Sequence, residues 1–126
     1  NEALKEDFRF IIKQKGGMLA KGWLLGVQFS ELLRDGLYFE LAKHADDMAM
    51  KINKAVKEAG YSFYSESPAN QQFVVFPDSL LEKLNEKYIF EYQARVDEGH
   101  SAVRICTSWA TKEENVDMLV EDIKKG

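Results

Sequence analysis

The stretch A-V-R-I-C-T-S-W-A-T, residues 102–111, contains the side chain best suited to binding a ligand, Arg104. Val103 and Ile105 flank it and alternate with it as residues of a β-strand do. If those two face the packed side of a sheet, Arg104 projects from the other side. Its guanidinium is a planar fork that matches a carboxylate bidentately, and a strand holds that fork rigidly. Two interpretations stay open: an anion receptor, or a solvated strand arginine that pairs with Glu91.

A second group of charged residues, Lys13, Lys15 and Lys21, flanks the Gly16-Gly17 pair. Exposed backbone amides and ammonium groups of this kind can receive a phosphate. A solvated helix end explains the same lysines equally well, and the residues alone do not choose between the two.

Other residues that could do chemistry lack the spacing of a catalytic or metal site. No Gly-rich phosphate loop precedes a helix. His44 and His100 are far apart in the sequence, so we expect no metal site. We expect His44 at the edge of an apolar helix stripe and His100 in a solvated turn. We expect Cys106 to be a small buried hydrophobe rather than a reactive thiol. Asp46-Asp47 and Glu113-Glu114 fit solvated helix faces.

Composition excludes several classes of protein. The 126 residues include 17 basic and 21 acidic side chains, a net charge of −4 that does not favour nucleic-acid binding. No apolar run approaches the roughly 18 residues needed to span a membrane. With one cysteine, no intramolecular disulfide can form, which fits a reducing compartment. We therefore expect a cytoplasmic protein that binds neither nucleic acid nor membrane.

The elements that must position Arg104 fall into two groups. Apolar residues at helical spacing predict helices over 2–15, 18–34 and 37–59, the last ended by Gly60. After Gly60 the apolar period changes to two, which predicts strands over 61–65, 72–76, 89–96 and 102–107. A short helix is expected over 78–85. A capping box, Thr111 to Glu114, opens a last helix that runs to Lys125. Helices followed by an antiparallel sheet indicate an α+β domain of two layers.

Three stretches resemble bacterial threonine aldolases: D-F-R-F-I-I-K-Q-K-G-G-M-L-A-K-G-W-L-L-G-V-Q-F at 7–29, L-Y-F-E-L-A-K-H-A-D-D-M-A at 37–49, and V-R-I-C-T-S-W-A-T at 103–111. They keep their order and approximate spacing, and the resemblance covers essentially the whole chain. On these motifs the chain is similar to the C-terminal domain of low-specificity threonine aldolases, in the aromatic amino acid β-eliminating lyase group.

The resemblance implies the fold of a small domain of a fold-type-I (aspartate-aminotransferase type) pyridoxal-phosphate enzyme. That fold has three to four antiparallel strands packed on helices, with N-terminal helices leading in. It implies that residues 1–36 form interdomain and interface helices and that 37–126 form the C-terminal small α+β domain. The implied partners are a large N-terminal cofactor-binding domain of the same chain, further subunits of a homo-oligomer (a tetramer in the family), and a small amino acid substrate.

The resemblance also implies roles for single residues. In the family an arginine in the strand before the T-S-W-like segment binds the substrate α-carboxylate, and Arg104 matches that position. Lys21 is the candidate for reaching the cofactor phosphate, a weaker match because several members carry arginine at the positions of Leu19 or Gly22-Trp23. The family's Schiff-base lysine lies upstream of the region that matches Asp7. We therefore expect no catalytic residue in this chain.

The full-length enzyme implied by the resemblance would use pyridoxal 5'-phosphate to cleave L-threonine or L-allo-threonine to glycine and acetaldehyde. We expect this chain to be a fragment, which its start at Asn1 rather than methionine also suggests, and to be inactive and free of cofactor by itself. Two alternatives stay open: a fragment of another pyridoxal-phosphate-dependent β-eliminating lyase, and a free-standing α+β binding module.

Overall fold

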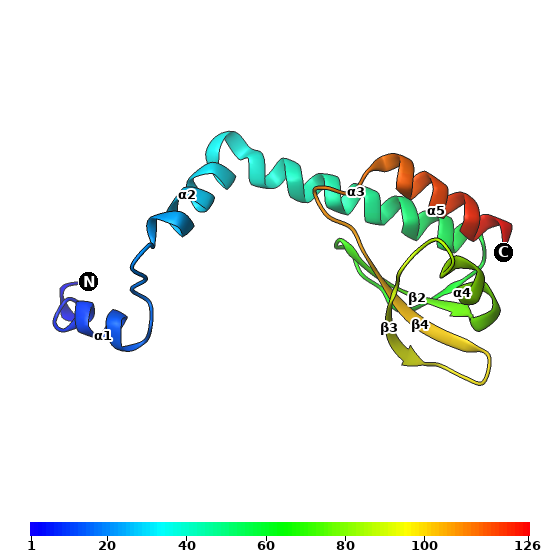
Figure 1. Ribbon diagram of the computed structural model, residues 1–126, viewed down its shortest axis with the longest axis horizontal. Helices are drawn as coiled ribbons and strands as arrows, with labels where there is room; N and C mark the ends of the chain where they lie inside the picture. Colours follow the sequence, from blue (N-terminus) through cyan, green and yellow to red (C-terminus); the bar gives the residue numbers. More distant parts are fainter. The chain divides into compact units, whose positions relative to one another are not determined.

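The computed structural model describes residues 1–126 and divides them into two compact units, Asn1–Tyr38 and Phe39–Gly126. The first unit is made of short helices, which Figure 1 draws in blue and cyan. They are η1 (Glu2–Leu4), α1 (Phe8–Gln14), α2 (Trp23–Leu32) and η2 (Arg34–Gly36). α3 (Leu37–Glu58) starts at the end of this unit and lies almost wholly in the second.

The helices of the first unit are shorter than the sequence predicts. Asp7, in a left-handed conformation at φ 57°, separates η1 from α1, and residues 18–22 precede α2 rather than belonging to it. Neither α1 nor α2 contains a buried residue. Because short helices are marginal without tertiary packing, an apolar stripe that is not buried does not hold the full predicted length in a helix.

The second unit confirms the expected α+β fold. Its four strands form one antiparallel sheet in the order β1-β2-β4-β3. After α3, the elements are β1 (Ser62–Ser65), β2 (Gln71–Pro77), α4 (Asp78–Leu84), β3 (Glu91–Arg95), β4 (His100–Cys106) and α5 (Glu113–Lys125). Figure 1 shows the three helices of this unit gathered against the sheet.

One hydrophobic core joins the three helices to the inner strands. Each helix contributes an apolar stripe, and the two inner strands contribute their alternate residues. The members are Met48, Ile52 and Val56 of α3, Val74 and Phe76 of β2, Leu80, Leu81 and Leu84 of α4, Val103 and Ile105 of β4, and Val116, Leu119 and Ile123 of α5. β4 is thereby held on both edges by neighbouring strands and on one face by the core.

Two predicted helix ends have different outcomes. Gly60 has φ +81° just after α3, which confirms the left-handed stop. The capping box that was expected at Thr111 is wrong, because α5 has Lys112 as its N-cap with no side-chain hydrogen bond. The Thr111 hydroxyl instead accepts a hydrogen bond from the Ser108 N–H at 2.8 Å. It therefore orders the turn before α5 rather than the helix itself.

Candidate functional site

Arg104 projects from the face of the sheet opposite the core. It lies near the middle of β4, directly across from Phe73 on β2 and Glu91 on β3. Its flanking residues Val103 and Ile105 are buried in the core at 5% and 7% exposure. Since successive side chains of a strand point to opposite faces, Arg104 and its two cross-strand partners share the other face. The alternation in the sequence predicts this direction correctly.

The guanidinium of Arg104 has no partner within the chain. Its Nε is buried and makes no hydrogen bond, and no ion pair joins Arg104 to Glu91 although the two lie directly across from each other. The terminal nitrogens also form no hydrogen bond or ion pair, and the residue as a whole is half-buried. A buried donor without an acceptor costs about 1–3 kcal/mol, more for a charged group. The arrangement therefore suits a site that an external acceptor completes.

The segment that follows Arg104, at the end of β4, is fixed by hydrogen bonds at Thr107. The Thr107 hydroxyl donates to the carbonyl of Ala45 at 2.6 Å, which ties the end of β4 to α3. The Thr107 N–H donates to the Asn70 carbonyl at 3.0 Å, and the Asn70 amide donates back to the Thr107 carbonyl at 2.7 Å. Sequence reasoning missed this cluster, because nothing in the spacing of a turn asparagine and a strand-end threonine links the two.

A second contact fixes the segment between β4 and α5. His44 Nε2 lies 2.8 Å from the Thr111 carbonyl and donates to it. His44 is half-buried on α3, as expected of a residue at the edge of the apolar stripe. Trp109, between these two anchored points, is 68% exposed. The T-S-W-A-T segment is thus held at both ends while its aromatic side chain faces solvent.

Lys21, the residue expected at a phosphate, is exposed in the stretch before α2, and its ammonium group forms no hydrogen bond or ion pair. Lys13 and Lys15 are exposed as well. These lysines belong to the first unit and Arg104 to the second. Within its own unit, the exposed side chain of Lys21 presents a free ammonium group.

The expectation that Cys106 is buried is wrong. Cys106 is exposed at the end of β4, where it pairs with Gln71, the first residue of β2. It lies on the same face of the sheet as Arg104, two residues away, and lines a cleft together with residues of α5. His100 is exposed at the start of β4, as expected, with its Nδ1 2.8 Å from an Asp97 carboxylate oxygen.

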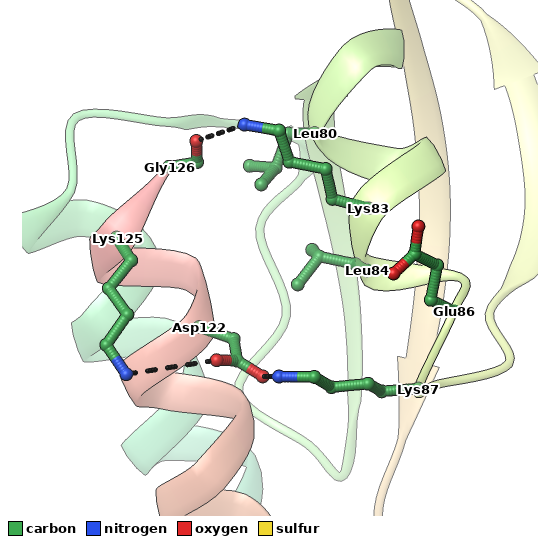
Figure 2. A pocket seen from close by; sticks show the side chains of 8 residues that line it. All are labelled: Leu80, Lys83, Leu84, Glu86, Lys87, Asp122, Lys125 and Gly126. Carbon is green, nitrogen blue, oxygen red and sulfur yellow. Dashed lines mark hydrogen bonds and ion pairs between the residues drawn. The ribbon is translucent and has the colours of Figure 1, made fainter.

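A cleft of about 320 Å³ between α4 and α5 is lined by three lysines and by the carboxylates of Glu86 and Asp122 (Figure 2). Asp122 accepts hydrogen bonds from Lys87 at 2.8 Å and from the Tyr88 hydroxyl at 3.0 Å. These two donors, Lys87 first, lower the pKa of Asp122. Lys83 donates to the Gly126 carbonyl at 3.1 Å. Since Asp122 and Gly126 engage these ammonium groups, the cleft is a structural tie between helices.

The described residues contain no arrangement that could hold a metal ion. No group of three or more histidine, cysteine, aspartate or glutamate side chains is placed to do so. None of the helices is both long enough and apolar enough to cross a bilayer. Arg104 is therefore the best candidate for a functional group in the chain.

Comparison with known proteins gives these features a context. No protein-family model matches the chain. A curated low-specificity L-threonine aldolase from Pseudomonas sp. (strain NCIMB 10558) is 30% identical over 129 residues, 98% of this chain and 35% of that protein. The solved threonine aldolase of Leishmania major matches with a TM-score of 0.90 and 37% identity, over 99% of this chain and 36% of that one. The chain is related to the threonine aldolases. It spans about a third of the length of these two relatives.

Two further solved structures share the fold at low identity. Serine palmitoyltransferase of Sphingomonas wittichii matches 66% of the chain with a TM-score of 0.54 and 13% identity. An 8-amino-7-oxononanoate synthase from Francisella tularensis matches 81% with a TM-score of 0.58 and 15% identity. At these identities the likeness concerns the fold alone. Together with the threonine aldolase match, it confirms the expected fold, that of the small domain of fold-type-I enzymes.

Proposed function

We propose that the chain is the C-terminal small domain of a pyridoxal-phosphate-dependent threonine aldolase and that Arg104 receives the α-carboxylate of its amino acid substrate. The observation that carries this proposal is the unpaired guanidinium on the open face of the sheet. The similarity to threonine aldolases over 98–99% of the chain supports it. So does the position of Arg104, one residue after Val103 in the V-R-I-C-T-S-W motif.

The chemistry assigned to Arg104 is binding and orientation. Its terminal nitrogens can hold both oxygens of a carboxylate, and the central strand keeps that fork in place. Pyridoxal phosphate, when bound, supplies the electron sink for cleaving the Cα–Cβ bond of the substrate. Arg104 would fix one end of the substrate so that this bond stands perpendicular to the cofactor ring, which raises the rate through orientation.

The cofactor itself we assign mainly to the part of the protein outside this chain. A free ammonium group such as Lys21 fits a phosphate by charge, so Lys21 is the one cofactor contact we propose here. The Schiff-base lysine would lie in a large N-terminal domain, and the chain alone would be inactive. Residues 1–36 would form interdomain and interface helices of a cytoplasmic homo-oligomer, and 37–126 the small domain.

The experiment that tests the proposal replaces Arg104 in the full-length protein. In Arg104→Lys and Arg104→Ala, we expect kcat/KM for L-threonine to fall by about a hundredfold or more, roughly 3 kcal/mol of lost transition-state stabilisation. Steady-state kinetics against threonine concentration give this value, and the absorbance of the bound cofactor shows that the variants still hold it.

Arg95→Lys is a matched control in the same sheet. Arg95 lies on β3 and pairs with Asp78 at 2.6 Å, so its loss affects stability without touching Arg104. We expect kcat/KM to stay near wild type in this control. Unchanged cleavage in both Arg104 variants would show that Arg104 is an ordinary strand residue and would overturn the proposal.

A further inference from the structure

One negative charge stands among the neighbours of Arg104 on the open face of the sheet. The two residues directly across from it are Phe73, which is half-buried, and Glu91, which is exposed. The next positions on this face are uncharged or apolar: Gln71 and Val75 on β2, Ala94 on β3, and Ala102 and Cys106 on β4. Glu91 is thus the nearest carboxylate in the strands that border Arg104.

The pairing of the strands limits how far apart these two charges can be. Side chains directly opposite in an antiparallel pair have Cβ atoms about 4.5–5.5 Å apart. Glu91 can therefore reach the guanidinium, yet the two form no ion pair, and the Glu91 carboxylate stays in solvent. Its charge acts on Arg104 through space without occupying the nitrogens that a ligand would use.

We propose that the negative charge of Glu91, across the strand pair from Arg104, determines how tightly Arg104 holds carboxylate ligands. A carboxylate bound to Arg104 must come to rest beside the Glu91 carboxylate, and the two like charges repel. The same repulsion favours release of a carboxylate product. This inference rests on the proposed role of Arg104 and adds to it a residue that opposes binding rather than assisting it.

The test measures binding of glycine and of glycinamide to the full-length holoenzyme at constant ionic strength. Glycinamide has the same amino group without the carboxylate charge. In Glu91→Gln we expect the Kd of glycine to fall about three- to tenfold, the size of a partly screened repulsion at this range. The Kd of glycinamide should not change. KM for threonine should fall in parallel while kcat stays the same.

Two variants complete the design. Glu98→Gln removes an exposed carboxylate from the turn between β3 and β4, away from Arg104, and should leave both affinities unchanged. Glu91→Thr introduces a neutral residue that favours strands and differs in shape from glutamine. If the lost charge causes the effect, Glu91→Thr should change the Kd of glycine as Glu91→Gln does.

The outcomes separate this inference from the proposed function. If Arg104→Ala leaves glycine affinity unchanged, the role of Arg104 itself is wrong. If Arg104→Ala weakens glycine but Glu91→Gln leaves its Kd unchanged, only the role of the Glu91 charge is overturned. A weaker affinity for glycine in Glu91→Gln would also overturn it, because Glu91 would then orient the arginine rather than compete with the ligand.

Discussion

At the scale of single residues, the proposed site depends on the absence of a hydrogen-bond or ion-pair partner for the Arg104 guanidinium. Most buried polar atoms in proteins have a hydrogen-bond partner, so the unpaired Nε of Arg104 needs an explanation. Glu91 is in the right register to pair with it and does not. A ligand carboxylate on the guanidinium would account for the absence of a protein partner, because it would compensate the charge of the whole group.

Asp122 provides a residue-scale prediction about pH and stability. Lys87 and Tyr88 lower its pKa in the folded chain, so its contribution to stability is present above the ordinary aspartate pKa and is lost as pH falls through the lowered one. Asp122→Asn should therefore be less stable than wild type near neutrality. As pH falls through the lowered pKa of Asp122, the wild-type carboxyl becomes protonated too, and the difference should shrink.

Urea unfolding followed by circular dichroism at a series of pH values measures this effect. Glu82→Gln, an exposed acid on α4 with no ion pair, is the control and should follow the wild-type curve. A constant difference between Asp122→Asn and wild type across the whole pH range would show that the loss comes from packing rather than from the ion pairs.

Residue types in the sequence indicated the direction of Arg104 but not the pairing of polar groups. Alternation with Val103 was sufficient to place Arg104 opposite the core. Cys106 was misjudged because its exposure depends on where β4 ends and what covers that end. The buried Gln72, which accepts a hydrogen bond from Asn53 at 2.7 Å, was also unforeseen, since that contact joins residues of a helix and a strand.

At the scale of elements, apolar periodicity predicted the length of a helix correctly only where the apolar stripe is buried in the core. α3 buries its apolar stripe and ends within a residue of the predicted end at 59, whereas α2 buries nothing and is much shorter than predicted. β3 is shorter than expected, and its pairing with β4 is irregular between Tyr92 and Ala94. Such a bulge shifts register by one residue and leaves no clear mark in apolar spacing.

Thr107 gives an element-scale prediction because it joins α3, β4 and the loop before β2. Thr107→Val keeps the shape but removes the hydroxyl that donates to Ala45, so a buried carbonyl loses its 2.6 Å partner. We expect a loss of about 1–3 kcal/mol in the free energy of unfolding. Thr107→Ser keeps the hydroxyl and should retain most of the stability in denaturant unfolding. A Thr107→Val variant as stable as wild type would contradict the prediction, because it keeps the methyl group and lacks only the hydroxyl.

At the scale of the whole molecule, the two units differ in how they are stabilised. The second has a core with members such as Val56 and Phe76 that are fully buried. The first buries none of its helical residues and exposes Trp23, Leu24, Leu25 and Phe29 by 46–66%. Apolar surface of this kind on a soluble protein marks a contact site.

We therefore predict that the 126-residue chain associates with itself through its first unit. Sedimentation velocity over a range of concentrations should show species larger than a monomer for residues 1–126. A shorter chain of residues 39–126, which keeps the core, should sediment as a monomer. Trp23→Ser with Phe29→Ser in the longer chain should reduce the association. A monomer at every concentration for residues 1–126 would contradict this prediction.

The central claim, that Arg104 recognises a carboxylate, is tested most directly by comparing L-threonine with L-threoninamide as substrates of the full-length protein. The amide differs from the acid only in the group that Arg104 would bind. We predict that wild type prefers the acid by about a hundredfold in kcat/KM and that Arg104→Ala loses most of this preference. If Arg104→Ala keeps the full preference for the acid, another residue recognises the carboxylate and the account is wrong.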